Sequence, residues 1–413
     1  MMKTKVYIFN SACRGAAYGV GTYIEMLTSS LENTSIEYGI VNLFSEAAEP
    51  ADETKNGHHT VNIPKAPVNG MIGQKRYARS VAYLLSEFIT VEKETKLVFH
   101  LNFMTEPYLV AYLKRLFPKC KVVLVAHYTN WSFTLMGDEA KLLEIVDKPS
   151  RKRDPLEKSI VSDLRNDIRM ISKVDKFVCV ANHTLDTFQK VGNIDMSKCM
   201  VINNALRDEY VPVTDETRQK LREKYRIGKD ETVILYVGRL DYVKGIRFLL
   251  ESFNQVLEKI PAAHLFLVGE GDFAACMSWA KTNWSHVSFT GRLSRDQVFD
   301  FYKLADVGVV CSLHEEFGLV ATEMMMNALP MVATDTGGLA EIVDQRVTGV
   351  KIPVVSKENN RIVSTEELAD AICELATNKP MAQSYGEHAR SKFLGKYEQS
   401  LFTQKMINLY NSL

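Results

Sequence analysis

The stretch DVGVVCSLHEEFGLVATEMMMNALPMVATDTGGLAE, residues 306–341, predicts a buried strand that leads through a loop into a helix. VGVV is a short, β-rich apolar run, residues 311–318 have the character of a loop, and residues 319–327 that of a helix. In α/β proteins, a loop that follows a strand and opens a helix binds ligands. We therefore predict an α/β fold with a ligand site at this loop.

Two glutamates give this loop and its helix a chemistry suited to sugars. Glu315 lies in the loop and Glu323 one turn into the helix, and each carboxylate accepts two hydroxyl hydrogen bonds. Gly318 lets the backbone approach a ligand, and the N–H groups at the helix start favour an anion. The alternative is that Glu323 is a solvated helix residue and Glu315 a cap, because Glu is common on helix surfaces.

Length and charge limit the class of protein. A chain of 413 residues exceeds what one hydrophobic core usually supports, so we expect two domains of roughly 200 residues. Basic and acidic residues are balanced at 50 each, which excludes the broad positive footprint of a nucleic-acid-binding protein. Before Ala205 there are 26 basic and 22 acidic residues, so this half is better suited to anionic acceptors or a membrane surface.

Cysteine usage and hydropathy indicate the compartment. The seven cysteines include no CxxC pair, which predicts neither a disulfide framework nor a zinc site. No apolar run approaches the roughly 18 residues needed to cross a bilayer. We expect a cytoplasmic protein, with peripheral contact at the inner face of the membrane left open, and the oligomeric state is also left open.

Residues 1–205 are predicted to form the first α/β domain. A strand at 5–10 leads through a loop containing Gly19 and Gly21 into a helix from about Thr22, a weak pattern for phosphate binding. His100 and His127 are expected at or near strand ends, where ligands bind, although lone histidines are often structural. Residues 128–155 are polar and irregular, which predicts an acceptor-side lid or a solvated charge run.

Residues 206–395 are predicted to form a second α/β domain after a hinge at 205–212, and residues 396–413 a helix that packs back on the first domain. The segment GRLDYVKG, residues 238–245, follows a strand and offers Arg239 and Lys244 to a diphosphate, unless these cations form a surface pair near Asp241. Further strand-end loops contain Gly269, Gly291 and Arg292. The chain has no DxD motif, so we predict no metal site.

These motifs resemble those of a known family. GRLDYVKG, GEG at 269–271, FTG at 289–291 and HEEFGLVATE at 314–323 are similar to the donor-domain motifs of family 4 retaining glycosyltransferases. The similarity covers about residues 232–350, and the first domain matches more loosely. Ala328 stands where the family usually has a glycine at a helix end. The resemblance implies a GT-B fold, with two Rossmann-like parallel-sheet domains facing a central cleft and a C-terminal helix crossing back to the first domain.

The resemblance also implies roles for individual residues. Arg239 and Lys244 would hold the diphosphate and Glu323 the ribose, while Glu315 would contact hydroxyls of the transferred sugar. The remaining residues implied to contact the donor are Phe317, Gly318 and Leu319 beside the sugar, His127 near it from the first domain, and Gly19 or Gly21 at the phosphate. Independently of the resemblance, the strand-end loops with Gly269, Gly291 and Arg292 offer backbone amides and carbonyls to the base of the donor.

The implied activity is transfer of a hexose-type sugar, with retention of anomeric configuration, from a nucleoside diphosphate sugar to a glycan, lipid or peptide acceptor. A UDP-sugar is favoured over a GDP-sugar, and no metal or other cofactor is expected. Two alternatives stay open: a nucleotide-sugar epimerase or hydrolase, and a non-catalytic GT-B subunit that binds a nucleotide sugar.

Overall fold

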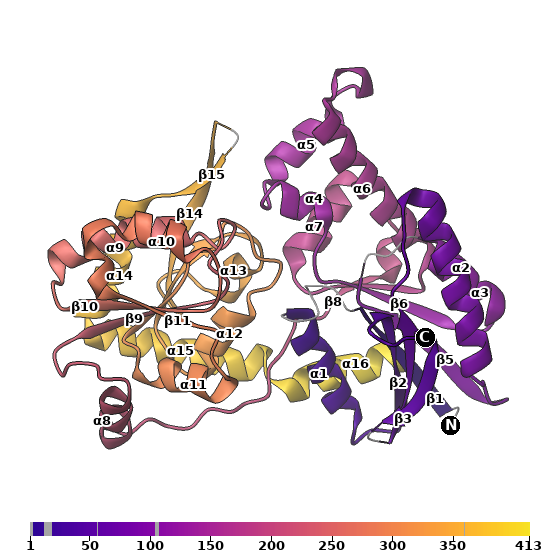
Figure 1. Cartoon of the computed structure of the whole chain (residues 1–413), viewed down its shortest axis with the longest axis horizontal. Coiled ribbons are helices and arrows are strands. Elements are labelled where there is room, and N and C mark those ends of the chain that lie inside the picture. The colour runs from indigo at the N-terminus through magenta and orange to yellow at the C-terminus, as the bar shows by residue number, and fades with distance from the viewer. Residues whose placement is uncertain (1–2, 12–18, 56, 104–106, 359) are drawn as a thin grey trace. The chain divides into compact units, whose positions relative to one another are not determined.

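The chain forms two compact units, each built around its own sheet (Figure 1). The computed structural model describes residues 3–11, 19–55, 57–103, 107–358 and 360–413. The first unit contains Met1–Leu135, Glu139–Ala205 and Gln399–Leu413, and the second contains Met136–Asp138 and Leu206–Glu398. We describe each unit separately.

The first unit contains an eight-stranded sheet in the order β3-β4-β2-β1-β5-β6-β7-β8, parallel except for β3. Its strands are β1 (Lys3–Ser11), β2 (Ile36–Ser45), β3 (Ala51–Lys55), β4 (His58–Pro64), β5 (Thr95–Leu101), β6 (Lys121–Ala126), β7 (Lys176–Cys179) and β8 (Cys199–Val201). The strand order reverses between β1 and β5, and in such sheets ligands bind outside the carboxyl ends of the strands at that point.

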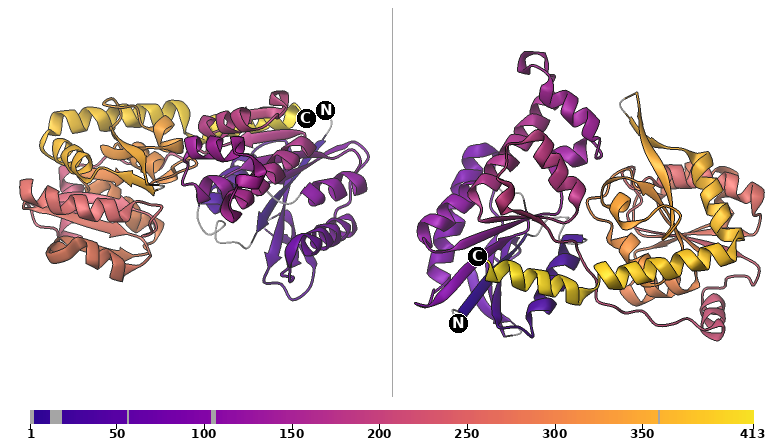
Figure 2. Two further views of the ribbon diagram at one scale, coloured as in Figure 1. Left: turned by 90° about the horizontal axis from the view of Figure 1, so that it is seen from above. Right: turned by 180° about the vertical axis from the view of Figure 1, so that it is seen from behind.

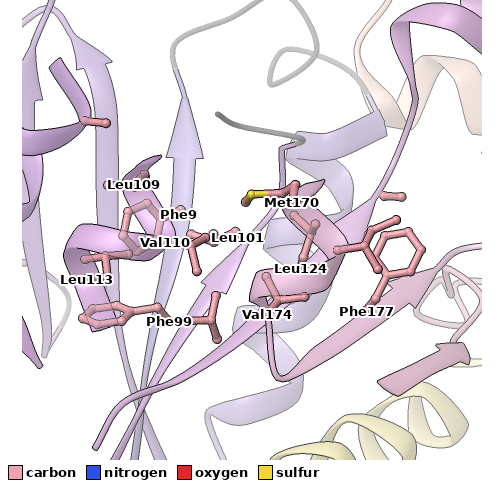
Figure 3. Packing of buried hydrophobic residues seen from close by; sticks show 14 of the residues in the cluster. Phe9, Phe99, Leu101, Leu109, Val110, Leu113, Leu124, Met170, Val174 and Phe177 are labelled. Atoms are coloured by element: carbon pink, nitrogen blue, oxygen red, sulfur yellow. The ribbon is translucent and has the colours of Figure 1, made fainter. Parts of the chain in front are cut away.

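The helices of the first unit cover this sheet. They are α1 (Gly19–Leu31), α2 (Gly70–Phe88), α3 (Pro107–Leu116), α4 (Asn130–Thr134), α5 (Glu139–Asp147), α6 (Pro155–Lys173), α7 (Asn182–Val191) and α16 (Gln399–Asn411), with short 3-10 helices at Ser150–Lys152 and Met196–Lys198. Leu109, Val110 and Leu113 are spaced to share one face of α3, and they pack in the same buried cluster as Phe9 and Phe99 of the sheet (Figure 3).

The segment 128–155 differs from the predicted irregular loop. It contains α4, α5 and a 3-10 turn, so the prediction of a long loop is wrong. Its basic cluster is also partly structural: Arg153 donates to the carbonyl oxygen of Ile145 at 2.9 Å, and Lys148 pairs with Glu157 at 2.8 Å. The helices escaped prediction because they are short and α5 buries only two apolar side chains.

The C-terminal helix α16 packs on the first unit, alongside α1 (Figure 2), which confirms that part of the predicted fold. The side chain of Lys96 donates to the Tyr410 carbonyl oxygen at 3.0 Å, so the end of α16 is tied to β5. The predicted start of the first helix is wrong: α1 begins at Gly19, so Gly19 and Gly21 lie in its first turn and not in a preceding loop.

The second unit contains a seven-stranded sheet in the order β11-β10-β9-β12-β13-β14-β15. Its strands are β9 (Thr232–Val237), β10 (Ala263–Val268), β11 (Val287–Gly291), β12 (Val307–Val310), β13 (Met331–Asp335), β14 (Val350–Lys357) and β15 (Asn360–Val363). All pairs are parallel except β14 with β15, a hairpin at the sheet edge. The first six strands have the Rossmann order 3-2-1-4-5-6, which confirms the predicted Rossmann-like architecture.

The helices of the second unit alternate with its strands along the chain up to β14. They are α8 (Asp215–Lys224), α9 (Ile246–Lys259), α10 (Phe273–Ala280), α11 (Arg295–Leu304), α12 (Leu319–Met326), α13 (Gly337–Ile342), α14 (Thr365–Thr377) and α15 (Lys379–Lys396), with a 3-10 helix at Lys281–His286. A signal for α14 was present, because Ser364 caps the helix by accepting from the Glu367 N–H. Among the helices described in the two units, none is long and apolar enough to span a membrane.

Helix α12 ends in a Schellman motif with alanine at the position that usually holds glycine. Ala328 has φ 54°, in the left-handed region. Its N–H donates to the Met325 carbonyl oxygen at 3.1 Å, and the Leu329 N–H donates to that of Met324 at 3.0 Å. The side chain of Ala328 therefore imposes backbone strain at this helix end.

We expect Ala328→Gly to raise the free energy of unfolding by about 0.5–1 kcal/mol. Removing the Cβ relieves about 1–2 kcal/mol of left-handed strain, partly offset by about 0.4–1 kcal/mol from the greater freedom of glycine in the unfolded chain. Urea unfolding measures the difference. The control Ala274→Gly, at an exposed position in α10, should destabilise the protein. Equal losses in both variants would contradict the interpretation.

Candidate active site

The candidate site lies at the carboxyl edge of the second sheet, where the strand order reverses. Strand β9 is flanked by β10 and β12, so the loops that follow β9 and β12 emerge side by side. The first loop contains Arg239 and Lys244 and the second contains Glu315. Ligands of doubly wound sheets bind at this position.

Lys244 and Glu315 contact each other directly. The Lys244 ammonium pairs with Glu315 Oε1, and the Ser312 hydroxyl donates to the same oxygen at 2.9 Å. Burial by itself would raise the pKa of Glu315, but the ammonium and the hydroxyl outweigh it, so the pKa of this carboxyl lies below its usual value. The side chains are 22% and 18% exposed, so the charged pair is accessible to a ligand while remaining poorly solvated.

The backbone holds the two loops together. The Leu313 N–H donates to the Val243 carbonyl oxygen at 2.7 Å, and the Lys244 N–H donates to Asp241 Oδ1 at 3.0 Å. Between these contacts Gly245 lies so close to the second loop that a Cβ atom would be 1.9 Å from the Cys311 carbonyl oxygen. The position of Lys244 against Glu315 is therefore set by main-chain contacts as well as by charge.

Both cations have carboxylate partners within the protein. Lys244, expected to hold the diphosphate, lies against Glu315, expected to contact hydroxyls of the sugar. Arg239 pairs with Asp241 at 3.0 Å, which is the pairing that the sequence left open as an alternative. The loops thus carry two ion pairs, and an incoming anion would compete with Glu315 and Asp241 for their cations.

Glu323 lies in α12 and has its own partner. The Tyr302 hydroxyl of α11 donates to Glu323 Oε2 at 2.6 Å. Burial raises the pKa of Glu323 above its usual value, although the Tyr302 hydrogen bond and the positive charge of Arg295 oppose the shift. The carboxyl is therefore oriented by Tyr302, a residue that the sequence analysis did not find.

The segment from Phe317 to Leu319 is packed against two other elements. The Phe317 ring is buried edge-on against Tyr397, with centroids 5.7 Å apart, so its side chain belongs to the core. The Gly338 N–H at the start of α13 donates to the Glu315 carbonyl oxygen at 2.8 Å. Because α12 begins at Leu319, the backbone N–H groups of its first turn have no partner within the helix and can serve a ligand.

The loops after β10 and β11 end at the same edge of the sheet. The Gly269 N–H donates to the Gly291 carbonyl oxygen at 3.0 Å, so this N–H already has a partner within the protein. Arg292 follows β11 directly and is exposed. In the strand order, β10 and β11 lie on the side of β9 opposite to β12, so the loops that follow them lie on that side of the loop after β9.

The predicted residues of the first unit lie at the corresponding edge of its own sheet. His127 follows β6 directly and is partly buried, and its Nε2 lies 3.2 Å from Asn102 Oδ1. His100 lies inside β5 and is fully buried. Gly19 is exposed and Gly21 partly buried in the first turn of α1.

Asp241, Ser312 and Tyr302 orient the predicted residues and were not themselves predicted. Asp241 and Ser312 each stand three residues before the group they contact, Lys244 and Glu315, so this spacing was a usable signal. Tyr302 reaches Glu323 across 21 residues of sequence, and no local pattern indicates that contact.

Comparison of the whole fold places the chain in a structural class. Sucrose-phosphate synthase from Thermosynechococcus elongatus matches with a TM-score of 0.76 and 18% identity, covering 99% of this chain and 98% of that one. Anabaena HepE, solved in complex with UDP-glucose, matches with a TM-score of 0.71 and 16% identity, covering 99% and 100%. The protein has the GT-B fold, as predicted.

Sequence comparison finds a similarity to a known family in the second unit. Residues 217–392 match the family model for glycosyl transferases group 1. An uncharacterized glycosyltransferase of Methanocaldococcus jannaschii is 34% identical over 163 residues, which are 38% of this chain and 42% of that protein. The chain thus spans less than half the length of this relative, and residues 217–392 carry the family resemblance.

Proposed function

We propose that the protein is a family 4 glycosyltransferase that moves a hexose-type sugar from a nucleoside diphosphate sugar with retention of configuration. The observation that carries the proposal is the pair formed by Lys244 and Glu315 where the strand order of the second sheet reverses. A cation for phosphate and a carboxylate for hydroxyl groups lie there side by side. The match of residues 217–392 to glycosyl transferases group 1 supports it.

The ion pairs give the site a way to accept a charged ligand. A diphosphate offers Lys244 and Arg239 new anionic partners, which releases Glu315 from its cation to accept hydrogen bonds from the sugar hydroxyls. We assign the ribose to Glu323, whose carboxylate accepts a hydrogen bond from the Tyr302 hydroxyl. A UDP-sugar is the donor we favour, supported by the complex of the structurally similar HepE with UDP-glucose.

The proposed reaction breaks the bond between the anomeric carbon and the diphosphate oxygen and forms a bond from the same carbon to the acceptor oxygen on the same face. The acceptor proton passes to the departing phosphate oxygen. Negative charge grows on the diphosphate during this step, so the fixed charges of Lys244 and Arg239 stabilise the transition state. We propose that these cations and helix N-termini, and not a metal ion, neutralise the diphosphate.

Two other functions use the same donor site and make different predictions. A nucleotide-sugar epimerase or hydrolase would turn over the donor without an acceptor. A non-catalytic GT-B subunit would bind the donor and turn over nothing. The fold is shared by all three and does not separate them.

A thermal-shift panel of UDP-, GDP- and ADP-sugars, each with and without EDTA, tests the donor site. We expect one nucleotide to raise the melting temperature and EDTA to leave that shift unchanged, because a specific ligand stabilises the fold that binds it. The anomeric configuration of the product, followed by NMR with an acceptor library, then tests retention. Stabilisation by none of the sugars would contradict the proposal, and loss of the shift in EDTA would contradict its metal independence.

A further inference from the structure

A buried polar cluster lies at the carboxyl edge of the first sheet, where the strand order reverses between β1 and β5. Its centre is Asn102, a fully buried residue directly after β5. The Asn102 Nδ2 atom lies 3.0 Å from the Phe9 carbonyl oxygen, and Oδ1 lies 3.2 Å from Nε2 of both His100 and His127. One side-chain amide thus joins two imidazole rings.

The partner on β1 determines the orientation of this amide. A backbone carbonyl oxygen accepts hydrogen bonds and has no proton to donate, so the amide NH₂ group has to face Phe9. The Oδ1 atom then faces both rings, and as an acceptor it requires a proton on Nε2 of each. Turning the amide over would set its oxygen against the Phe9 oxygen, and both atoms are acceptors.

His100 supports this assignment from the other side of the cluster. Burial lowers the pKa of His100 to about 3, although the Asn102 hydrogen bond opposes the shift, so the ring is neutral at physiological pH. With its proton on Nε2, the ring has an acceptor at Nδ1, and the Tyr410 hydroxyl of α16 lies 2.8 Å from that atom. The Tyr410 hydroxyl therefore donates to His100 Nδ1, and His100 Nε2–H donates to Asn102 Oδ1. The Tyr23 hydroxyl oxygen also lies 3.2 Å from His100 Nε2.

We infer that Asn102 is a positioning residue that holds His127 in the Nε2–H tautomer, so that any proton His127 exchanges with its surroundings is on Nδ1. The Tyr23 ring packs edge-on against His127, with centroids 4.4 Å apart, and fixes the plane of the imidazole. Asn102 is in turn held by Phe9 and by the chain from Tyr410 through His100. The C-terminal helix thereby contributes to the orientation of His127.

The tautomer of His127 is measurable without any assay of activity. Two-bond ¹H–¹⁵N correlations of protein labelled with ¹⁵N-histidine distinguish the two neutral tautomers, and the pattern lost in His127→Gln identifies this residue among the nine histidines. At pH 8 we expect the Nε2–H pattern for His127 in the wild-type protein. Asn102→Leu, which removes the acceptor oxygen, should give a mixture of tautomers.

A matched control separates the effect of Asn102 from general loosening of the sheet edge. Asn42 of β2 bonds to Asn10 at 3.1 Å and to Asn62 at 2.9 Å, so it is also an amide within a ladder of polar side chains. We expect Asn42→Leu to leave the His127 pattern unchanged. An Nδ1–H pattern in the wild type, or an unchanged Nε2–H pattern in Asn102→Leu with native near-UV circular dichroism, would overturn the inference. The wild-type spectrum decides the tautomer even without a folded Leu variant.

The consequence for catalysis rests on the proposed function. With a donor and acceptor identified, we expect Asn102→Leu to lower kcat about 10- to 100-fold with little change in KM for the donor, because a displaced imidazole loses the productive geometry. A rise in KM at unchanged kcat would contradict a role in positioning His127. If no sugar is transferred at all, the proposed function fails, and the tautomer measurement still decides the role of Asn102.

Discussion

Lys244→Met is expected to lower kcat/KM for the nucleotide-sugar donor about 10²- to 10³-fold, because it removes a fixed positive charge from the place where the diphosphate becomes more negative. The ammonium lies against Glu315 at the point where the strand order reverses. Steady-state kinetics with the donor identified by thermal shift measure the loss.

The same substitution affects stability, and a double variant separates the two effects. Lys244→Met leaves Glu315 without its counter-ion, which we expect to cost about 1–2 kcal/mol, less than a fully buried pair because both side chains are partly exposed. Lys244→Met with Glu315→Gln removes both charges and should recover most of the stability but none of the transfer. A double variant with near wild-type transfer would show that the ion pair is only structural.

Lys259 provides the control for these variants. It pairs with Asp370 on the surface of the same unit, and its side chain is 54% exposed. Exposed pairs contribute little to stability because water screens both charges, so Lys259→Met should leave both stability and kcat/KM close to those of the wild type.

Gly245→Ala is expected to lower the free energy of unfolding by about 2–5 kcal/mol. Gly245 has φ 70°, which costs a residue with a Cβ atom about 1–2 kcal/mol. The new methyl group would also lie 1.9 Å from the Cys311 carbonyl oxygen, and relieving that overlap by moving the loops costs about 1–3 kcal/mol more. The displacement would separate Lys244 from Glu315, so transfer should fall as well. Urea unfolding measures the stability.

Gly291→Ala controls for the backbone conformation. Gly291 has φ 68°, and a Cβ atom there would meet no heavy atom within 4 Å. We expect this variant to lose only the conformational cost of about 1–2 kcal/mol. The difference in unfolding free energy between Gly245→Ala and Gly291→Ala measures the cost of the close approach of the β9 and β12 loops. Equal losses of stability in the two variants would contradict that explanation.

Much of the fold could be predicted from the sequence, because strands and helices leave local patterns. The strand Val307–Val310 was predicted at its observed limits, since a short β-rich apolar run ends there at clear loop residues. The same reasoning failed for residues 128–155, where short helices bury few apolar side chains. It also missed α14, although the Ser364 cap was a local signal for it.

The sequence by itself determined which loops follow strands and that Arg239, Lys244 and Glu315 lie in such loops, because hydrophobic periodicity is a property of neighbouring residues. Only the tertiary structure brought Lys244 against Glu315, 71 residues away, because strand order is decided by packing across the whole sheet. Likewise, only the fold joined Asn102 to two histidines. It also brought Tyr410 of the last helix to His100, which lies 310 residues earlier in the chain. Such contacts depend on which elements become neighbours, and no local pattern records that.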